Sequence, residues 1–160
     1  MKIKIKKLSK SREIAKKIVI ANRCIVLNEQ GKILLLQRSH RDNFEPGKWE
    51  FPGGKLEQGQ DTMHALEREV LEEAGVMIVP ITHIAYTYSE VNTFGKYKGY
   101  TYVLIVGIGR HINGEVILSK EHDAYKWVTE KEALKMDIRD EIRKSLIVLS
   151  RTIKSLSKNK

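Results

Sequence analysis

The stretch GGKLEQGQDTMHALEREVLEEAGV, residues 53–76, joins a glycine turn to a short acidic helix, and the rest of the chain is arranged around it. Either Asp61 or Thr62 is suited to cap the start of this helix, and Gly75 is suited to end it. The apolar residues recur at steps of three and four, which predicts a helix with one buried stripe: Met63, Leu66, Val70 and Ala74.

Three glutamates of this helix share one face. Glu69, Glu72 and Glu73 stand at i, i+3 and i+4, so their carboxylates lie side by side. At ~4 Å two unit charges repel by roughly 4 kcal/mol at an effective dielectric of about 20, so this face needs a counter-ion. Mg²⁺ fits best, because it takes oxygen ligands and keeps positions open for substrate phosphates. The alternative interpretation is a solvated face, which acidic helices commonly present.

The spacing within the stretch resembles the Nudix box, G-x5-E-x7-R-E-U-x-E-E-x-G-U, where U is a bulky aliphatic residue. Gly54 opens the pattern, and REVLEEAGV at residues 68–76 matches its second half, Gly75 included. The one departure is Gln60, which stands where the family carries a glutamate. The resemblance covers roughly residues 21–149 and implies an α/β fold, a Nudix-type α/β/α sandwich with a mixed β-sheet.

Within the family, WEFPGGKLE from Trp49 onward is most similar to the MutT-like branch. Members of that branch hydrolyse nucleoside triphosphates to monophosphate and pyrophosphate, often favouring oxidised guanine nucleotides such as 8-oxo-dGTP. The resemblance implies that Mg²⁺, or Mn²⁺ in its place, is held by the three helix glutamates, the Gly53 carbonyl and Glu121. It also implies that Glu69 or Glu121 takes the proton of the attacking water. Spacing does not choose between them, because clustered carboxylates titrate as a group.

Further site residues follow from the same comparison and from chemistry. Lys55, directly after the turn, is suited to hold a phosphate oxygen. Arg38 precedes a polar loop and could face a phosphate, although a solvated loop is the alternative. Asp140 aligns with the position where MutT-like enzymes contact the purine edge, and its alternative role is to favour a helix start. Arg68 is predicted to pair with a carboxylate or the glycine turn, and the Gln60 amide to accept a hydrogen bond from it or from a metal-bound water.

The 160 residues suit one domain, and a hydrophobic content of 41% is ordinary for a globular protein. The net charge of +9 is concentrated at the ends: residues 1–17 carry eight Lys or Arg against one Glu, and residues 150–160 carry four against none. We therefore expect a basic N-terminal extension at 1–17, a Nudix domain at 18–150 and a basic C-terminal tail at 151–160. Residues 18–149 sum to −2, so nucleic acid is expected to bind only through the tails, if at all.

Aliphatic runs predict a hairpin of strands at 18–27 and 33–37, and further strands at 76–89, 100–108, 115–118 and 125–128. Thr129 and Glu132 form a capping box at the start of a short helix. The single Cys24 lies in an apolar run and is predicted to be a buried strand residue. No run is long enough for a signal peptide or a membrane span, which predicts a cytoplasmic protein. From Asp137 a closing amphipathic helix is predicted, with apolar residues at helical spacing: Ile138, Ile142, Leu146, Leu149 and Ile153.

Other functions compete with nucleoside triphosphate hydrolysis. One is a non-catalytic Nudix-like binding module, against which the intact glutamate trio argues. Another is a nucleic-acid-associated protein that works through its basic tails. A closer rival is a Nudix hydrolase of another nucleotide, such as a dinucleoside polyphosphate or ADP-ribose, because the box handles only metal and diphosphate.

Overall fold

Strands β1 (Ile18–Leu27) and β2 (Ile33–Arg38) form the predicted hairpin in the computed structural model, which describes residues 17–93 and 96–157. Strands β3 (Trp49–Glu50) and β6 (His122–Val128) both pair antiparallel with β2. On the other side, β5 (Thr101–Asn113) runs parallel to β1 along its whole length and antiparallel to β4 (Met77–Val91). The sheet is therefore mixed, as predicted, in the order β3-β2-β1-β5-β4 with β6 beside β2.

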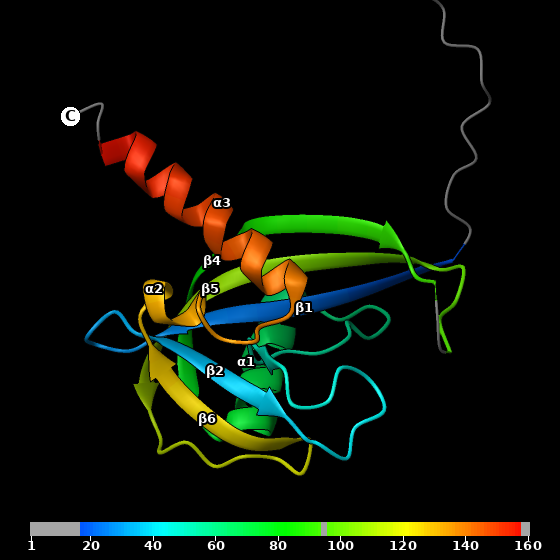
Figure 1. Cartoon of the computed structure of the whole chain (residues 1–160), viewed down its shortest axis with the longest axis horizontal. Helices are drawn as coiled ribbons and strands as arrows, with labels where there is room; N and C mark the ends of the chain where they lie inside the picture. The colour runs from blue at the N-terminus through cyan, green and yellow to red at the C-terminus, as the bar shows by residue number, and fades with distance from the viewer. Residues whose placement is uncertain (1–16, 94–95, 158–160) are drawn as a thin grey trace, which may run out of the picture.

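The helices cover both faces of this sheet (Figure 1). Helix α1 (Thr62–Ala74) lies on one face, and α2 (Glu130–Ala133) and α3 (Asp140–Ser157) lie on the other. Because side chains alternate along a strand, β1 and β2 each supply residues to both layers. The α1 layer buries a cluster that includes Cys24, Val26, Leu34, Leu36, Leu66 and Val70. The α/β/α sandwich expected from the resemblance is confirmed.

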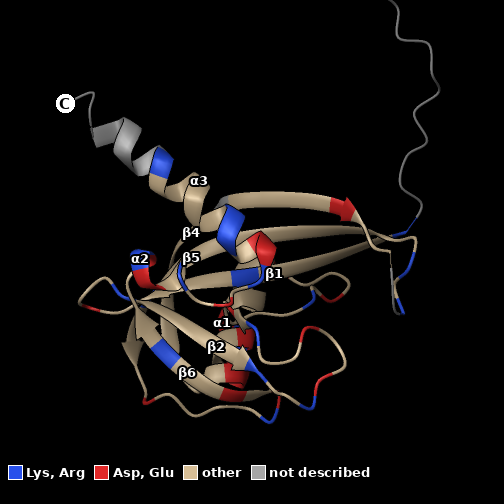
Figure 2. Ribbon diagram, in the orientation of Figure 1, with Lys and Arg blue, Asp and Glu red and all other residues tan. Residues whose placement is uncertain are grey.

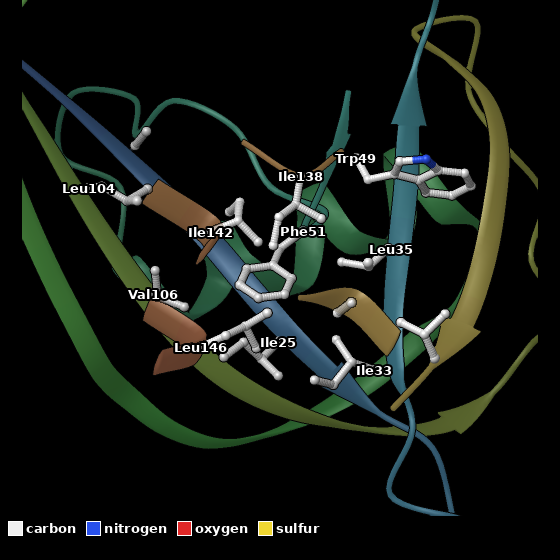
Figure 3. Close-up of a cluster of buried hydrophobic side chains, with 13 residues drawn as sticks. Ile25, Ile33, Leu35, Trp49, Phe51, Leu104, Val106, Ile138, Ile142 and Leu146 are labelled. Atoms are coloured by element: carbon white, nitrogen blue, oxygen red, sulfur yellow. The ribbon is translucent and has the colours of Figure 1, made fainter. Parts of the chain in front are cut away.

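The layer under α3 centres on Phe51, which is fully buried (Figure 3). Burial in the opposite layer raises the pKa of the Cys24 thiol to about 12, so this residue is an inert strand residue, as predicted. The two layers lie on opposite faces of the sheet, and Glu73 of α1 contacts the glycine turn beside β1. In the layer under α3, the side chains packed around Phe51 are Ile25, Leu35, Leu104, Val106, Ile138, Ile142 and Leu146.

The predicted strand at 115–118 is wrong, and other strands are longer than predicted: β4 ends at Val91, β5 ends at Asn113 and β6 begins at His122. Residues 115–118 form no strand, because the amides of Ile117 and Ser119 donate to the carbonyls of Ala74 and Glu73 at the end of α1. The last carbonyls of a helix lack partners within it, and this segment supplies the donors. The capping box of Thr129 and Glu132 is present as predicted.

The closing helix starts later than expected, at Asp140. Residues 137–139 extend along β3 instead: the Trp49 amide donates to Asp137, and the Arg139 amide donates to Trp49. Helix α3 then continues to Ser157, so the predicted tail at 151–160 is largely helical backbone, while the Ile153 side chain lies outside the described residues. Apart from Lys17, the predicted extension at 1–17 also lies outside them. Within residues 17–93 and 96–157, no helix combines the length and apolar character needed to span a membrane.

Candidate active site

Local sequence signals place α1 and its glutamates. Of the two possible caps, Asp61 is the one used, and its carboxylate accepts from the amides of Met63 and His64. Gly75 ends the helix in the left-handed conformation, with φ of 68°. Burial of the predicted stripe against the sheet fixes the rotation of the helix, and the glutamate face is turned toward the glycine turn.

The glycine turn runs along β1, where the Asn22 amide donates to Gly54 and the Cys24 amide donates to Pro52, both at 2.8 Å. Gly53 has a φ of 140°, and a Cβ there would lie 2.2 Å from the Asn22 carbonyl oxygen. A Cβ on Gly54 would lie 2.4 Å from the Glu69 carboxylate. The turn therefore needs two glycines for different reasons, one to approach β1 and one to admit a glutamate of α1.

Arg68 pairs with two glutamates of the shared face, as predicted for a structural arginine. Its guanidinium donates to Glu69 and to Glu72, both at 2.8 Å. The Gln60 side-chain oxygen lies 3.5 Å from the same guanidinium, so the predicted contact is present, and it also accepts from the Glu57 amide at 3.2 Å. Gln60 thus closes the turn and touches the glutamate cluster through Arg68.

Glu73 is the buried member of the three, with 8% of its surface exposed. Its carboxylate accepts from the Gly53 amide at 2.8 Å. Burial raises its pKa to about 7, although Arg23, His122 and the Gly53 amide act in the opposite direction. A buried acid that holds its proton this firmly lacks a full counter-charge.

This raised pKa makes the metal-free protein sensitive to pH. Between the ordinary value of 4.5 and about 7, the folded chain holds the Glu73 proton while the unfolded chain releases it, so rising pH lowers stability. We expect Glu73→Gln, in chelator and at about pH 8, to raise the free energy of unfolding by roughly 1–3 kcal/mol over the unsubstituted protein. Near pH 5 the difference should be small. Urea unfolding at both pH values measures this difference in the free energy of unfolding, with Glu67→Gln on the exposed face as the control. A difference that is the same at both pH values would contradict a raised pKa for Glu73.

A buried charge cluster that the sequence analysis missed stands behind the glycine turn. Glu50, whose side chain is 1% exposed, accepts from Arg38 and Arg139 at 2.7 Å each and pairs with Arg23 at 3.0 Å. His122 lies 3.4 Å from the same carboxylate. Burial alone would raise the pKa of Glu50, but these four neighbours outweigh it and hold the pKa well below its usual range.

Arg23 connects this cluster to the glycine turn. Its guanidinium donates to the carbonyls of Phe51 and Gly53 while it pairs with Glu50. The Gly53 carbonyl, a predicted metal ligand, therefore already has a buried donor. The sequence does contain a signal for this buried charge cluster. Arg23 and Glu50 lie inside apolar strand runs, where a charged side chain needs partners.

The remaining predicted residues are distributed around the site. Arg38 pairs with Glu50 and Asp42 and donates to the Phe44 carbonyl, so its guanidinium has a structural role in place of the predicted contact to a phosphate. Lys55 is exposed beside the turn, and Asp140 is exposed at the start of α3. Glu121 is exposed, but it follows closely on Ser119, whose amide is tied to the Glu73 carbonyl.

The donor set suits a hard divalent cation in its chemistry. Three carboxylates flank a turn with little side-chain bulk, and the buried Glu73 lacks a full counter-charge. In the described part of the chain, however, no three His, Cys, Asp or Glu side chains are close enough together to ligate one ion. Glu69 and Glu72 face Arg68 instead, so cation binding requires these two side chains to exchange partners.

An α/β/α sandwich whose glycine turn lies beside a central strand of a mixed sheet and meets a glutamate-bearing helix is the architecture expected of a Nudix protein. The model for the NUDIX domain matches residues 17–148. The chain belongs to the NUDIX domain family.

Individual relatives agree with this assignment. The 8-oxo-dGDP phosphatase NUDT18 of Mus musculus is 30% identical over 100 residues, which are 62% of this chain and 28% of that protein. The chain thus spans less than a third of that relative. An 8-oxo-dGTP diphosphatase of Buchnera aphidicola is 42% identical over 53 residues, 31% of this chain and 43% of the other. The crystal structure of a MutT protein from Methanosarcina mazei Go1 superposes with a TM-score of 0.75 at 31% identity, covering 89% of this chain and 99% of that one.

Proposed function

We propose that this protein hydrolyses a nucleoside triphosphate, such as 8-oxo-dGTP, to the monophosphate and pyrophosphate in the presence of Mg²⁺. The carboxylate face of α1, set against the Gly53-Gly54 turn, is the observation that carries this proposal. Two relatives are named for acting on 8-oxo-dGDP and 8-oxo-dGTP, which supports an oxidised guanine nucleotide as substrate.

The three helix glutamates are the residues that would hold the cation, with Glu121 and the Gly53 carbonyl as further ligands. Divalent cations, when bound, neutralise a polyphosphate and make water a better nucleophile at neutral pH. The water oxygen forms a bond to phosphorus, a phosphoanhydride bond breaks, and pyrophosphate leaves. The proton of that water passes to Glu69 or Glu121, and Lys55 holds a phosphate oxygen as a point charge.

Two carboxylates are proposed for opposite ends of the substrate. Glu121 follows two residues after Ser119, whose amide donates to the Glu73 carbonyl at the end of α1, and this proximity in the chain supports its proposed role. Asp140 stands exposed at the first residue of α3, next to Arg139 of the buried charge cluster, and we propose that it contacts the purine edge. Its exposure also suits the alternative role of favouring the helix start.

A substrate panel with Mg²⁺ tests this function most directly. The panel contains 8-oxo-dGTP, dGTP, dATP, a dinucleoside polyphosphate and ADP-ribose, and released pyrophosphate is measured against released phosphate. We expect pyrophosphate with the oxidised nucleotide as the preferred substrate. Preference for the dinucleoside polyphosphate or ADP-ribose would assign the other Nudix specificity, and nucleotide binding with no turnover would identify a non-catalytic module.

Gln60 removes one negative charge from the site, because the family carries a glutamate there. We expect Gln60→Glu to lower the Mg²⁺ concentration needed for half-maximal rate, since residues next to metal ligands commonly change affinity by ~10 to 100-fold. The contact to Arg68 at 3.5 Å would become an ion pair, leaving Glu69, which accepts from the same guanidinium nitrogen, freer to bind metal. Gln58→Glu, in the same loop but exposed, is the matched control. An unchanged or higher requirement would show that this site is built to work without the carboxylate.

A further inference from the structure

Lysines and tyrosines are interleaved at the end of the sheet where β1 begins. The Lys17 ammonium lies 5.1 Å from the centre of the Tyr100 ring. Tyr97 has two such neighbours, Lys55 at 5.1 Å and Lys96 at 5.5 Å. The two rings meet edge to face, with centroids 5.6 Å apart. We call these five residues the Lys–Tyr rim.

The Lys–Tyr rim has positive charge that nearby acids do not neutralise. In the described part of the chain, the lysine that pairs with a carboxylate is Lys48, with Glu45, and no rim lysine does so. Residues 1–16, which join the rim at Lys17, add seven Lys or Arg against one Glu. Figure 2 shows blue segments at this end of the sheet, beside the point where the chain enters β1. The positive charge of the N-terminal extension therefore continues onto the folded domain through the lysines of the Lys–Tyr rim.

The rim also borders an open hollow of about 500 Å³. Its lining combines aliphatic side chains with Tyr97 and Lys55, so an aromatic ring and an anion can be received together. Glu57 is the acidic residue in its lining and would repel a phosphate placed beside it. The aliphatic lining residues include Ile18, Ile20 and Leu56.

We propose that the Lys–Tyr rim binds single-stranded nucleic acid, with bases stacked on Tyr97 and Tyr100 and phosphates held by Lys17 and Lys96. Stacking on aromatic side chains combined with a basic track is how proteins hold single strands without reading their sequence. A duplex hides the faces of its bases, so it cannot use the rings. This binding does not use the α1 glutamates, where nucleotide hydrolysis is proposed to take place.

Strand binding exchanges partners at the rim. An exposed ammonium over an aromatic ring is a weaker contact than a base stacked on the same ring. A lysine that leaves the ring for a phosphate also releases a counter-ion from the strand. Strand binding therefore replaces weak ammonium–ring contacts with stacked bases and lysine–phosphate contacts.

The test measures binding of the full chain to a fluorescent oligonucleotide of about 12 nucleotides by anisotropy over a range of salt concentrations. We expect Tyr97→Leu to weaken binding about 5- to 100-fold with the salt slope unchanged, because a stacking contact is lost and no charge is. Lys96→Gln should instead make the slope shallower by about 0.7. Glu57→Gln should tighten binding, because a repelling carboxylate is removed. Lys55 is left intact in every variant, since it is proposed to hold substrate phosphate.

Controls separate this proposal from simpler ones. Tyr125→Leu removes an exposed tyrosine from β6 and should bind as the unsubstituted protein does. Failure of the proposed enzyme activity leaves this test intact, because anisotropy measures oligonucleotide binding and needs no turnover. Equal binding by Tyr97→Leu and the unsubstituted protein would overturn the proposal, since only non-specific attraction would remain. Equally tight binding to a duplex, or to vesicles rich in phosphatidylserine, would also overturn it.

Discussion

Glu72→Gln is expected to lower the Mg²⁺-dependent rate of nucleotide hydrolysis by about a hundredfold or more. The substitution keeps the shape of the side chain but removes one of three carboxylates that would hold the cation. Glu72 is well suited to this test, because 57% of its side chain is exposed and its partner is Arg68, one turn earlier on the same helix. Steady-state rates at saturating and limiting Mg²⁺ measure the effect, and near-normal turnover would contradict the assignment.

Stability separates loss of a ligand from loss of folding in the same variant. An exposed pair at this spacing contributes about 0.3–0.5 kcal/mol, and the relief of like-charge repulsion along the glutamate face, which is of similar size, offsets its loss. The Tm of metal-free Glu72→Gln should therefore hold or rise. Glu67→Gln, the same change on the other side of α1, should leave both hydrolysis and Tm unchanged. A large drop in Tm would assign Glu72 a structural role.

Glu50→Gln is expected to reduce the free energy of unfolding by about 3–5 kcal/mol. The amide that replaces the carboxylate leaves the buried Arg23 without its ion-pair partner. Arg38 and Arg139 each lose one partner as well, although Arg38 keeps Asp42 and Arg139 keeps Glu45 and Glu141. Removing one partner of a buried ion cluster costs far more than removing an exposed pair, because the remaining charges stay desolvated. Arg23 also holds the carbonyls of Phe51 and Gly53, so the glycine turn should loosen with it.

Urea unfolding near neutral pH measures this loss, with Glu29→Gln in the exposed β1–β2 loop as the control. The difference from the unsubstituted protein should then narrow as pH falls below the ordinary glutamate value of 4.5. Because the folded-state pKa of Glu50 is depressed, its contribution is complete above that value and is lost as pH falls toward the folded-state pKa. A loss no larger than that of Glu29→Gln would show that the cluster contributes little.

Helix α1 and its face of three glutamates could be predicted because the sequence signals for them lie close together in the chain. Asp61, the apolar stripe and Gly75 are all read within fifteen residues, and i, i+3 and i+4 spacing places three carboxylates together whatever surrounds the helix. The role of Gln60 beside Arg68 follows from the same short segment. The hairpin of β1 and β2 is equally local, since its turn and both strands are adjacent in the chain.

The tertiary structure decided where the charges are buried. Arg23, Glu50 and Arg139 come from β1, β3 and the segment before α3, and they meet only because residues 137–139 extend along β3. The same pairing delays the start of α3. Residues 115–118 form no strand because this segment donates hydrogen bonds to the last carbonyls of α1. Periodicity and capping depend on neighbours a few residues apart, so the sequence determined the helix and its glutamate face. Partners distant in sequence compete for hydrogen bonds and counter-charges, and only the folded chain settles which of them meet.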